Sequence, residues 1–447
     1  MALGGGTWVT QNKVLPGYYS NFISLANASA KLSDRGFCTM PLVLDWGKDN
    51  EVFAVTNEDF QKNSRKIFGY DYTDDTLKGL RDLFKNAQTL YAYRLNSDGD
   101  KATNTYATAQ CSGKRGNDLK IAIQVNIDDA SQFDVITYLG TSKVDVQTVA
   151  QVKELEANDF VTFKDNFTLE AVAATPLTGG TSSEITTQCY QNYFDKIESY
   201  SYNTMGIVTT DATIKGLAVS FNKRLRDEVG AKFQLVIYDY KKADYMGVIS
   251  VENKCLDGMH KKDNQTPMVY PDEAAAVYWT TGAECACAVN ASCQNKTYDG
   301  EYMIDTEYTQ TELKQLLKSG GFVFHSDNGT VKILDDINTM VTTTADQGDV
   351  FKDNQTIRVI DQIANDDAVV FNTKYLGIVP NDAAGRTALW SDFVKIRKEL
   401  QRIRAIQNFD ETDVTVSQGD TKKSVLVNNT IEVVNAMGQC YMTTVVA

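Results

Sequence analysis

Three closely spaced cysteines, Cys285, Cys287 and Cys293, form the densest set of candidate metal ligands in the chain. Cys255 or His260 could supply a fourth ligand. The spacing C-x-C-x5-C differs, however, from the paired C-x2-4-C motifs of structural zinc sites. The segment is also expected to be a helix of alanines and a glycine, where a thiol serves as a small apolar side chain. We therefore predict no metal at these cysteines.

Histidines are the usual proton carriers of enzymes, and the chain has two, His260 and His325. His325 lies at the end of a predicted hairpin strand, which favours a structural hydrogen bond, and His260 lies in a polar loop without a nucleophilic serine context. Motifs for phosphate loops, dinucleotide binding, serine hydrolase elbows and zinc proteases are absent from the sequence. The acidic pairs at 335–336 and 366–367 lack the glycine and terminal glutamate of a calcium loop. We predict no catalytic, cofactor-binding or metal site, and hence a protein that is not an enzyme.

The composition of the chain excludes several classes of protein. The 447 residues include 43% hydrophobic and 23% charged residues, which is ordinary for a globular chain with roughly three domains. The net charge of -14 argues against binding to nucleic acid or to an anionic membrane. No secretion signal and no apolar run of about 18 to 20 residues is found. We therefore expect folding in the cytoplasm, with the eight cysteines reduced.

The first half of the chain contains two segments with different patterns of apolar residues. Between Asn57 and Leu95, apolar residues at helical spacing are followed by a strand-like run that starts at Thr89. Residues 100–175 instead alternate apolar and polar side chains in short runs, as in 119–127. Because few helical patterns interrupt these runs, we predict an inserted all-β domain.

The middle of the chain returns to an α/β pattern. An apolar strand that starts at Met205 is followed by a helix that Asp211 can cap, and then by a second strand at 233–238. This order is a β-α-β unit, so we predict that its two strands are parallel. A second helix, rich in small residues, is expected over 272–291.

Two local motifs mark the elements that come next. Thr309 and Glu312 form a capping box that starts a third helix, and Gly320 is expected to end it. Asn328-Gly329 then separates two β-prone runs, which is a strong signal for a β-hairpin.

The clearest helix lies in the last quarter of the chain. Its apolar positions, from Leu389 to Ile403, step alternately by four and three residues and form one stripe. Between Arg386 and Ile406, six basic and two acidic residues leave a charge of +4 in a chain of net charge -14. Such a basic face suits either solvent or an acidic partner, and the residues alone leave both open. The basic residues opposite the stripe are Lys395, Arg397, Lys398, Arg402 and Arg404.

Both ends of the chain carry β-prone runs. At the N-terminal end a flexible glycine run, 4–6, precedes alternating β-branched and aromatic residues, and three further runs continue almost to Ala447. Chain ends fray unless something holds them, so these runs pair either with the chain's own sheets or with a neighbouring copy. The runs contain Thr7, Trp8, Val9 and Thr10 at one end, and Val425, Leu426, Val427, Ile431, Val433, Tyr441, Thr443 and Val445 at the other.

Several long and unusual stretches resemble the contractile tail sheath proteins of myophages and of prophage-derived particles of Gram-positive bacteria. They include GGGTWVTQNKVLPGYYSNF at 4–22, PLVLDWG at 41–47 and FNTKYLG at 371–377. The similarity is strongest over residues 1–95 and 350–447, and weaker across the predicted β insert.

The resemblance implies a fold. It is a multidomain α/β (α+β) fold with a subtilisin-like α/β core that lacks proteolytic activity, an inserted all-β domain, and extended strand-forming arms at both ends. The expected segments are an N-terminal arm at 1–20, an N-terminal α/β domain at 21–97, a β-sandwich insert at 98–178, the subtilisin-like core at 179–345, a tube-facing domain at 346–423 and C-terminal arm strands at 424–447.

The resemblance also implies a function. Sheath subunits stack as six-membered rings around an inner tail tube, and both arms add strands to the sheet of a neighbour. Expected partners are further copies of the chain, the inner tail tube protein, and the baseplate and tail terminator proteins, with no cofactor, nucleic acid or membrane insertion. By analogy and by charge, the basic helix is expected to face the tube through Lys395, Lys398, Arg402 and Arg404.

The expected location is the virion, after assembly in the host cytoplasm. Two rival functions stay open at this point. One is a hydrolase built on the α/β core, and the other is a different self-assembling shell or surface-layer protein.

Overall fold

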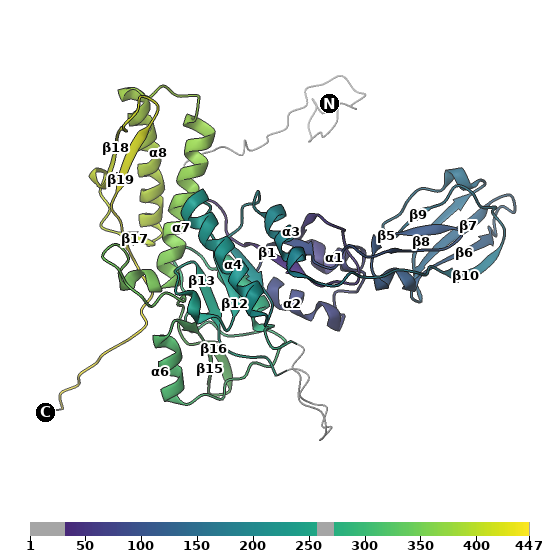
Figure 1. Cartoon of the computed structure of the whole chain (residues 1–447), viewed down its shortest axis with the longest axis horizontal. Coiled ribbons are helices and arrows are strands. Elements are labelled where there is room, and N and C mark those ends of the chain that lie inside the picture. Colours follow the sequence, from purple (N-terminus) through teal and green to yellow (C-terminus); the bar gives the residue numbers. More distant parts are fainter. Residues whose placement is uncertain (1–31, 257–271, 447) are drawn as a thin grey trace, which may run out of the picture. The chain divides into compact units, whose positions relative to one another are not determined.

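The computed structural model describes residues 32–256 and 272–446 (Figure 1). Of the described residues, 34–362 and 433–446 form the larger of two compact units, and 32–33 and 363–432 form the smaller. The predicted N-terminal arm strand, Thr7–Thr10, lies outside the described residues, as does His260. Among the described residues, no helix is both long enough and apolar enough to cross a lipid bilayer.

A seven-stranded sheet lies at the centre of the larger unit, in the order β14-β13-β12-β11-β1-β3-β2. Every neighbouring pair is parallel except β2 and β3, which are antiparallel. The predicted parallel pairing within the β-α-β unit is therefore confirmed by β11 and β12. The strands are β1 (Phe37–Leu42), β2 (Val52–Thr56), β3 (Thr89–Arg94), β11 (Thr204–Ile207), β12 (Gln234–Tyr238), β13 (Val248–Val251) and β14 (Gly321–Phe322).

This sheet joins two segments that the sequence placed in separate domains. Strand β1 pairs with β3 on one side and with β11 on the other, so residues 37–94 and 204–322 build one sheet. Its strands are buried on both faces, because Val236 packs into one hydrophobic cluster while Leu235 and Ile237 pack into another. The mixed α+β architecture is as expected, and the subtilisin-like classification of the core stays a prediction.

Helices cover both faces of the sheet. Buried side chains of α1, α2 and α5 belong to one hydrophobic cluster, and those of α3 and α4 belong to the other. Asp211 caps α4 as predicted, because its Oδ1 accepts hydrogen bonds from the backbone of Thr213 (2.7 Å) and Ile214 (3.2 Å). The helices are α1 (Asn57–Phe68), α2 (Lys78–Phe84), α3 (Thr187–Ile197), α4 (Ala212–Arg224) and α5 (Ala276–Ala286).

The predicted strands between residues 100 and 175 are present. They form a four-stranded antiparallel sheet, β10-β6-β7-β8, and a three-stranded one, β4-β5-β9. Residues from both sheets, such as Ala107 and Ile121, share one hydrophobic cluster. The strands are β4 (Lys101–Thr103), β5 (Ala107–Ser112), β6 (Leu119–Val125), β7 (Phe133–Leu139), β8 (Ser142–Val149), β9 (Val161–Phe163) and β10 (Val172–Pro176).

The predicted helix over 272–291 is shorter than expected, because α5 begins at Ala276 and ends at Ala286. Arg35 binds the end of this helix, donating hydrogen bonds to the carbonyls of Glu284 (3.1 Å) and Cys287 (2.8 Å). A side chain that satisfies the last carbonyls stabilises a helix end at that point. Cys293 consequently lies in a loop and not on the helix.

The predicted capping box and the predicted β-hairpin between residues 309 and 333 are both confirmed. Helix α6 (Gln310–Lys318) starts with the Thr309 and Glu312 capping box. Strands β15 (Phe324–Asp327) and β16 (Thr330–Ile333) form the predicted hairpin. The turn residues Asn328 and Gly329 have φ angles of 49° and 81°, and a turn of this kind favours asparagine and glycine.

The smaller unit contains the predicted long helix, α8 (Ala383–Arg402), whose apolar stripe is buried at Leu389, Phe393 and Ile396. Helix α8 packs on β18, and Trp390 Nε1 donates a hydrogen bond to the carbonyl of Val414 (2.9 Å). The boundary between the two units falls within α7. The remaining elements are α7 (Asn354–Val370), β17 (Ile406–Gln407), β18 (Val414–Gln418), β19 (Val425–Asn429) and β20 (Glu432–Val433).

Candidate functional site: assembly surfaces and a buried charged cluster

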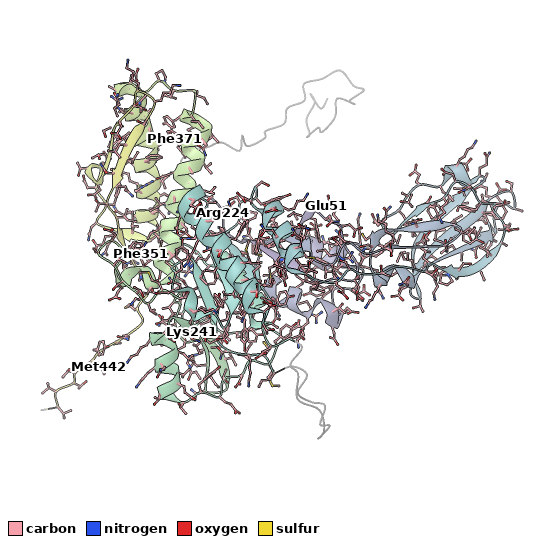
Figure 2. The ribbon with its side chains drawn as sticks, in the orientation of Figure 1. Glu51, Arg224, Lys241, Phe351, Phe371 and Met442 are labelled. Carbon is pink, nitrogen blue, oxygen red and sulfur yellow. The ribbon has the colours of Figure 1, made fainter. Side chains whose placement is uncertain are left out.

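The C-terminal segment 434–446, here called the tail, exposes apolar side chains. It contains no helix or strand and no charged residue. Met437 is 100% exposed, Tyr441 89% and Met442 84%, and Figure 2 labels Met442 on this segment. Thr443 and Val445 are exposed as well. A run of apolar side chains held in water is unfavourable, and this pattern is typical of a surface that a partner covers.

The beginning of the predicted C-terminal arm belongs to the chain's own fold. Val425, Leu426 and Val427 lie in β19, which pairs with β18 of the same chain along its whole length. Ile431 immediately precedes β20, and Val433 lies in β20, which pairs with β17. These strands therefore have a partner within their own chain, because β18 offers a β-prone partner across a short turn and closing a short loop costs little entropy. That the five residues also pair with a neighbouring copy stays a prediction.

The β18–β19 hairpin has backbone hydrogen-bonding groups along its outer edges that could pair with a further strand. Within the described chain it is a two-stranded sheet, so each of its strands has one edge without a partner strand. A groove of 570 Å³ lies beside β19, and its lining is mainly apolar with three basic residues. Its lining includes the apolar residues Phe371, Leu376, Ile378, Leu389 and Val425 and the basic residues Arg386, Lys422 and Lys423.

The four residues predicted to face the tube, here called the basic patch, are all exposed. Three of them have acidic neighbours, so the local positive charge is smaller than the sequence count suggests. Within the described part of the chain no carboxylate lies within ion-pair distance of Arg404, which follows α8 with a φ angle of 65°. The pairs are Lys395 with Asp392 (3.4 Å), Lys398 with Glu411, and Arg402 with Glu399 (2.5 Å).

Arg397 does not belong to the exposed basic face, contrary to the sequence-based expectation. Its side chain is 1% exposed and forms a two-point ion pair with Asp367, in which Nη2 and Oδ2 are 2.6 Å apart. Its guanidinium also lies over the ring of Phe393, 5.5 Å from the centroid. Arg397 follows Ile396 on the buried stripe by one position, so a rotation of about 100° places it at the edge of the buried face.

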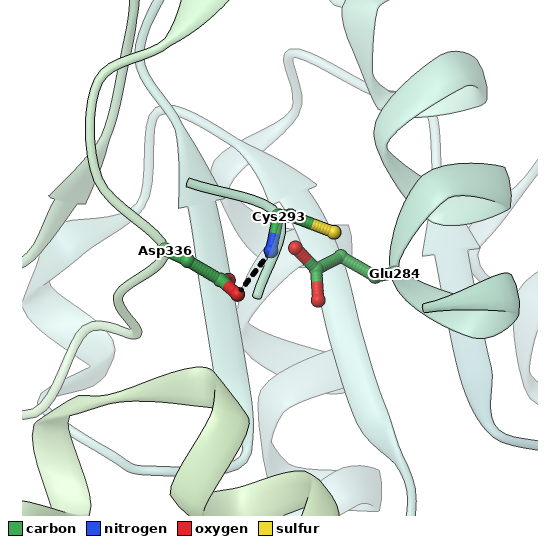
Figure 3. Close-up of side chains that lie close together, drawn as sticks. All are labelled: Glu284, Cys293 and Asp336. Carbon is green, nitrogen blue, oxygen red and sulfur yellow. Dashed lines mark hydrogen bonds between the residues drawn. The ribbon is translucent and has the colours of Figure 1, made fainter. Parts of the chain in front are cut away.

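A buried cluster of charged side chains lies in the larger unit. Arg358 from α7 contacts two carboxylates, Glu284 on α5 and Asp336 after β16, each at 2.5 Å. All three side chains are at most 1% exposed. Figure 3 shows Glu284, Cys293 and Asp336 pointing toward one another, with the backbone N–H of Cys293 donating to Asp336 Oδ2 at 2.8 Å.

The protonation of the two carboxylates differs. Burial raises the pKa of Glu284 well above its usual value, and the neighbouring Asp336 adds to this effect. Burial alone would also raise the pKa of Asp336, but Arg358 and several hydrogen bonds outweigh it and place the pKa below its usual value. These opposite shifts favour the proton on Glu284 and the negative charge on Asp336, next to Arg358.

Among the described residues, this cluster is the arrangement of side chains that comes nearest to a metal-binding site. Oxygen and sulfur atoms of Glu284, Asp336 and Cys293 lie within 4.8 Å of one another. Arg358 already occupies both carboxylates, however, and supplies the positive charge there. The hydrogen bond that its thiol donates to Cys287, together with burial, raises the pKa of Cys293 well above its usual range, whereas a metal binds the thiolate. The donor set therefore does not fit a metal ion.

The other candidate residues from the sequence, Cys255, Cys285, Cys287 and His325, do not form a common site with the charged cluster's carboxyl groups. Cys285 is buried as a small apolar side chain, in agreement with the prediction for the cysteines of this helix, and Cys255 is buried in the same hydrophobic cluster. Cys287 is half-buried, and the hydrogen bond with Cys293, together with Arg358, lowers the pKa of its thiol to about 7. His325 lies in β15, opposite Lys332 of β16.

Comparison with known proteins identifies the family. Descriptions of phage tail sheath domains match four consecutive segments: the domain III N-terminal region of tail sheath protein Gp18 at 35–95, the tail sheath β-sandwich domain at 97–183, the central domain at 183–339 and the C-terminal domain at 346–447. The crystal structure of the sheath tail protein from Desulfitobacterium hafniense is 35% identical, covers 90% of this chain and 93% of its own, and superimposes with a TM-score of 0.75. The chain belongs to the phage tail sheath family.

Two further relatives place this sheath protein within the family. The phage-like element PBSX protein XkdK of Bacillus subtilis (strain 168) is 30% identical over 98% of this chain and 99% of its own length. The helical sheath of the anti-feeding prophage in its contracted state, at 10% identity and a TM-score of 0.56 over 97% of this chain, shares the fold. The family identified from the sequence is thus confirmed, and its members are structural proteins.

Reasoning from the sequence missed the charged cluster of this sheath protein. In the sequence Asp336 stands out only as part of an acidic pair, and no pattern marks Arg358. Glu284 carried a usable signal, because it is a lone acidic residue in an otherwise apolar helix rich in small side chains. An acidic residue at a buried position requires a partner, and that requirement predicts an arginine or a proton at this place.

Proposed function

We propose that this chain is the repeating subunit of a contractile tail sheath, which polymerises as stacked hexameric rings around an inner tail tube and contracts to drive the tube through the host envelope. The observation that carries the proposal is the exposed apolar tail of a chain that belongs to this family. Burying one large apolar side chain is worth about 1.5–3 kcal/mol, so a covered tail contributes substantially to association.

The tail acts as a strand donated to a neighbouring subunit. Tyr441, Thr443 and Val445 alternate along the tail, so in an extended conformation they lie on one face. The free edges of the β18–β19 hairpin and the groove beside β19 suit such a strand, with backbone hydrogen bonds at the edge and apolar contacts in the groove. The N-terminal run Thr7–Thr10 is proposed to serve as a second donated strand.

Contacts of this head-to-tail kind repeat without closing and generate a helical polymer. Rigid cores can then repack while the arms keep each subunit attached to its neighbours. A free-energy difference of about 1–3 kcal/mol per subunit suffices, because it is multiplied over many copies. The extended form is held by a kinetic barrier, and no nucleotide or cofactor is needed.

Direct partners are proposed to be further copies of the chain, the inner tail tube protein, and the baseplate and tail terminator proteins. Nucleic acid and membrane lipid are not among them, in line with the net charge of -14. The proposed location is the virion, with assembly in the cytoplasm of the host bacterium.

The basic patch is proposed to hold the inner tube. Reversing its charges (Lys395→Glu, Lys398→Glu, Arg402→Glu and Arg404→Glu) is expected to weaken co-sedimentation with tube protein at least tenfold and to leave sheath self-assembly intact. Contacts between exposed charges are screened by salt, so binding by the parent protein is expected to fall between about 0.05 and 0.5 M salt.

Lys62→Glu provides the matched control, because Lys62 also forms an exposed ion pair within a helix but lies on α1. Tube binding is expected to survive this change. Equal tube binding by the four-fold reversed variant and the parent would refute the assignment of the basic patch.

Electron microscopy of the purified chain tests the proposed function itself. A sheath subunit is expected to form hollow, striated cylinders, either alone or when tube protein is added. Flat lattices would point to a surface-layer protein, and particles that remain monomeric with tube protein present would contradict the proposal.

A further inference from the structure

The start of the tail is held by the side chain of Gln355. Its Nε2 donates a hydrogen bond to the carbonyl of Val434 (3.1 Å), and its Oε1 accepts one from the backbone N–H of Ala436 (2.9 Å). A neighbouring β-strand would bind the same two backbone groups, so the amide of Gln355 replaces a strand partner over this short segment.

Thr356 binds the residue between these two. Its hydroxyl lies 3.2 Å from Oδ1 and 3.1 Å from Nδ2 of the Asn435 side chain. Three consecutive tail residues, 434–436, are therefore bound by two consecutive residues of α7. We call Gln355 and Thr356 the anchor.

The anchor is part of a rigid base. Gln355 is 2% exposed and Thr356 1%. Their backbone N–H groups both donate to Asp353 Oδ1, at 2.8 and 3.2 Å, which caps the start of α7. Further along α7, Arg358 binds the two carboxylates of the charged cluster, and Asp361 forms a buried two-point pair with Arg226 at 2.6 and 2.7 Å.

The environment of the tail changes immediately after the anchor. Ala436 donates to Gln355, whereas the next side chain, Met437, is completely exposed. Before the anchor, the chain passes through β20, which is only two residues long. The anchor is thus the strongest attachment described between the tail and the core of the larger unit.

We propose that Gln355 and Thr356 are positioning residues that fix the point at which the C-terminal arm leaves the subunit, and that they transmit the pull of neighbouring subunits into α7. The second half of this inference rests on the proposed function, because it requires that the tail binds another copy. The first half concerns the single subunit. A fixed origin limits the positions that the arm can reach, and pre-ordering of this kind lowers the entropic cost of binding.

Hydrogen exchange on the single subunit tests the first half. In Gln355→Leu, which keeps the size but removes both hydrogen bonds, the amide of Ala436 is expected to exchange at least tenfold faster than in the parent. Thr356→Val is a milder second variant that keeps the shape of the side chain, and it is expected to accelerate the same amide less. Gln315→Leu, the same change at an exposed position of α6 outside the tail, is expected to leave Ala436 protected.

Cylinders assembled from the same proteins test the second half. Sheaths of Gln355→Leu are expected to break under shear or heat before parent sheaths do, whereas sheaths of Gln315→Leu resemble the parent. Unchanged exchange at Ala436 in both anchor variants would overturn the anchor. Faster exchange combined with parent-like resistance to shear would overturn the transmission of load. Failure of the parent to form cylinders would contradict the proposed function and leave the exchange result to decide the anchor.

Discussion

A subunit that ends at Ala436 is expected to fold as the full chain does and to form no cylinders. The truncation removes Met437, Tyr441 and Met442, which are at least 84% exposed and contribute little packing within the subunit. It keeps the hydrogen bonds of Gln355 to Val434 and Ala436. The thermal midpoint of the monomer is therefore expected to change by less than about 2 °C, which calorimetry can measure.

Assembly is expected to respond very differently, because the proposed donated strand is gone. Electron microscopy and sedimentation velocity should show monomers under conditions in which the parent protein forms cylinders. A full-length variant with Tyr441→Ser, Met442→Ser and Val445→Ser separates the contribution of the side chains from that of the backbone. This variant is expected to assemble weakly, since it keeps the backbone hydrogen bonds and loses the apolar contacts. Normal cylinders from the truncated chain would show that the tail does not connect subunits.

Replacing Arg358 by methionine is expected to lower the free energy of unfolding by about 3–5 kcal/mol. The change leaves two carboxyl groups, Glu284 and Asp336, buried without their cation, and an unpaired buried charge is costly. Urea denaturation followed by circular dichroism measures the effect. Arg402→Met is the matched control, because Arg402 pairs with Glu399 at the surface, and no measurable change in the unfolding midpoint is expected there.

The two carboxyl groups of the cluster are expected to differ in the same assay. Burial raises the pKa of Glu284 and so favours its protonated form, which glutamine resembles, and Glu284→Gln should therefore be tolerated with a change of about 1 kcal/mol or less. Asp336→Asn removes the carboxylate that balances Arg358 and should cost more. The double variant Glu284→Gln/Asp336→Asn should lose more unfolding free energy than the two single variants together. The reason is that in each single variant the remaining carboxyl group can still supply the one negative charge that balances Arg358.

The pH dependence gives a second test of Glu284. The folded-state pKa of this group lies above the unfolded value of about 4.3, so folding takes up a proton between the two values. Its contribution to stability is therefore greatest at low pH and falls as the pH rises through that window. Glu284→Gln should lose this part of the pH dependence. A destabilisation by Glu284→Gln as large as that of Arg358→Met would show that Glu284 is ionised in the folded protein.

Signals that act between near neighbours could be read from the sequence with confidence. The Asp211 cap, the Thr309 and Glu312 capping box, and the Asn328-Gly329 turn depend on residues a few positions apart, and all three are present in the structure. Hydrophobic periodicity likewise predicted the buried stripe of α8, because the spacing of a helix is set by its own backbone.

Burial of polar residues was harder to predict. Arg397 and Lys398 are adjacent and both basic, yet Arg397 is buried against Asp367 and Lys398 is exposed. The choice depends on whether a distant carboxylate is available, because a buried cation requires one. The charged cluster escaped prediction for the same reason, since Glu284, Asp336 and Arg358 come from three separate segments.

The amino-acid sequence alone determined the family, the mixture of helices and strands, the β-rich insert and the absence of recognisable catalytic motifs, because these depend on composition, local spacing and long matching stretches. Only the tertiary structure decided which strands share a sheet and which of the β-prone runs near the C-terminus is exposed. Strand β1 pairs with both β3 and β11, and Val425–Val427 pair with β18, whereas Tyr441 remains exposed. Strand pairing is chosen by competition among many similar β-prone runs, and the outcome depends on contacts between residues far apart in the chain.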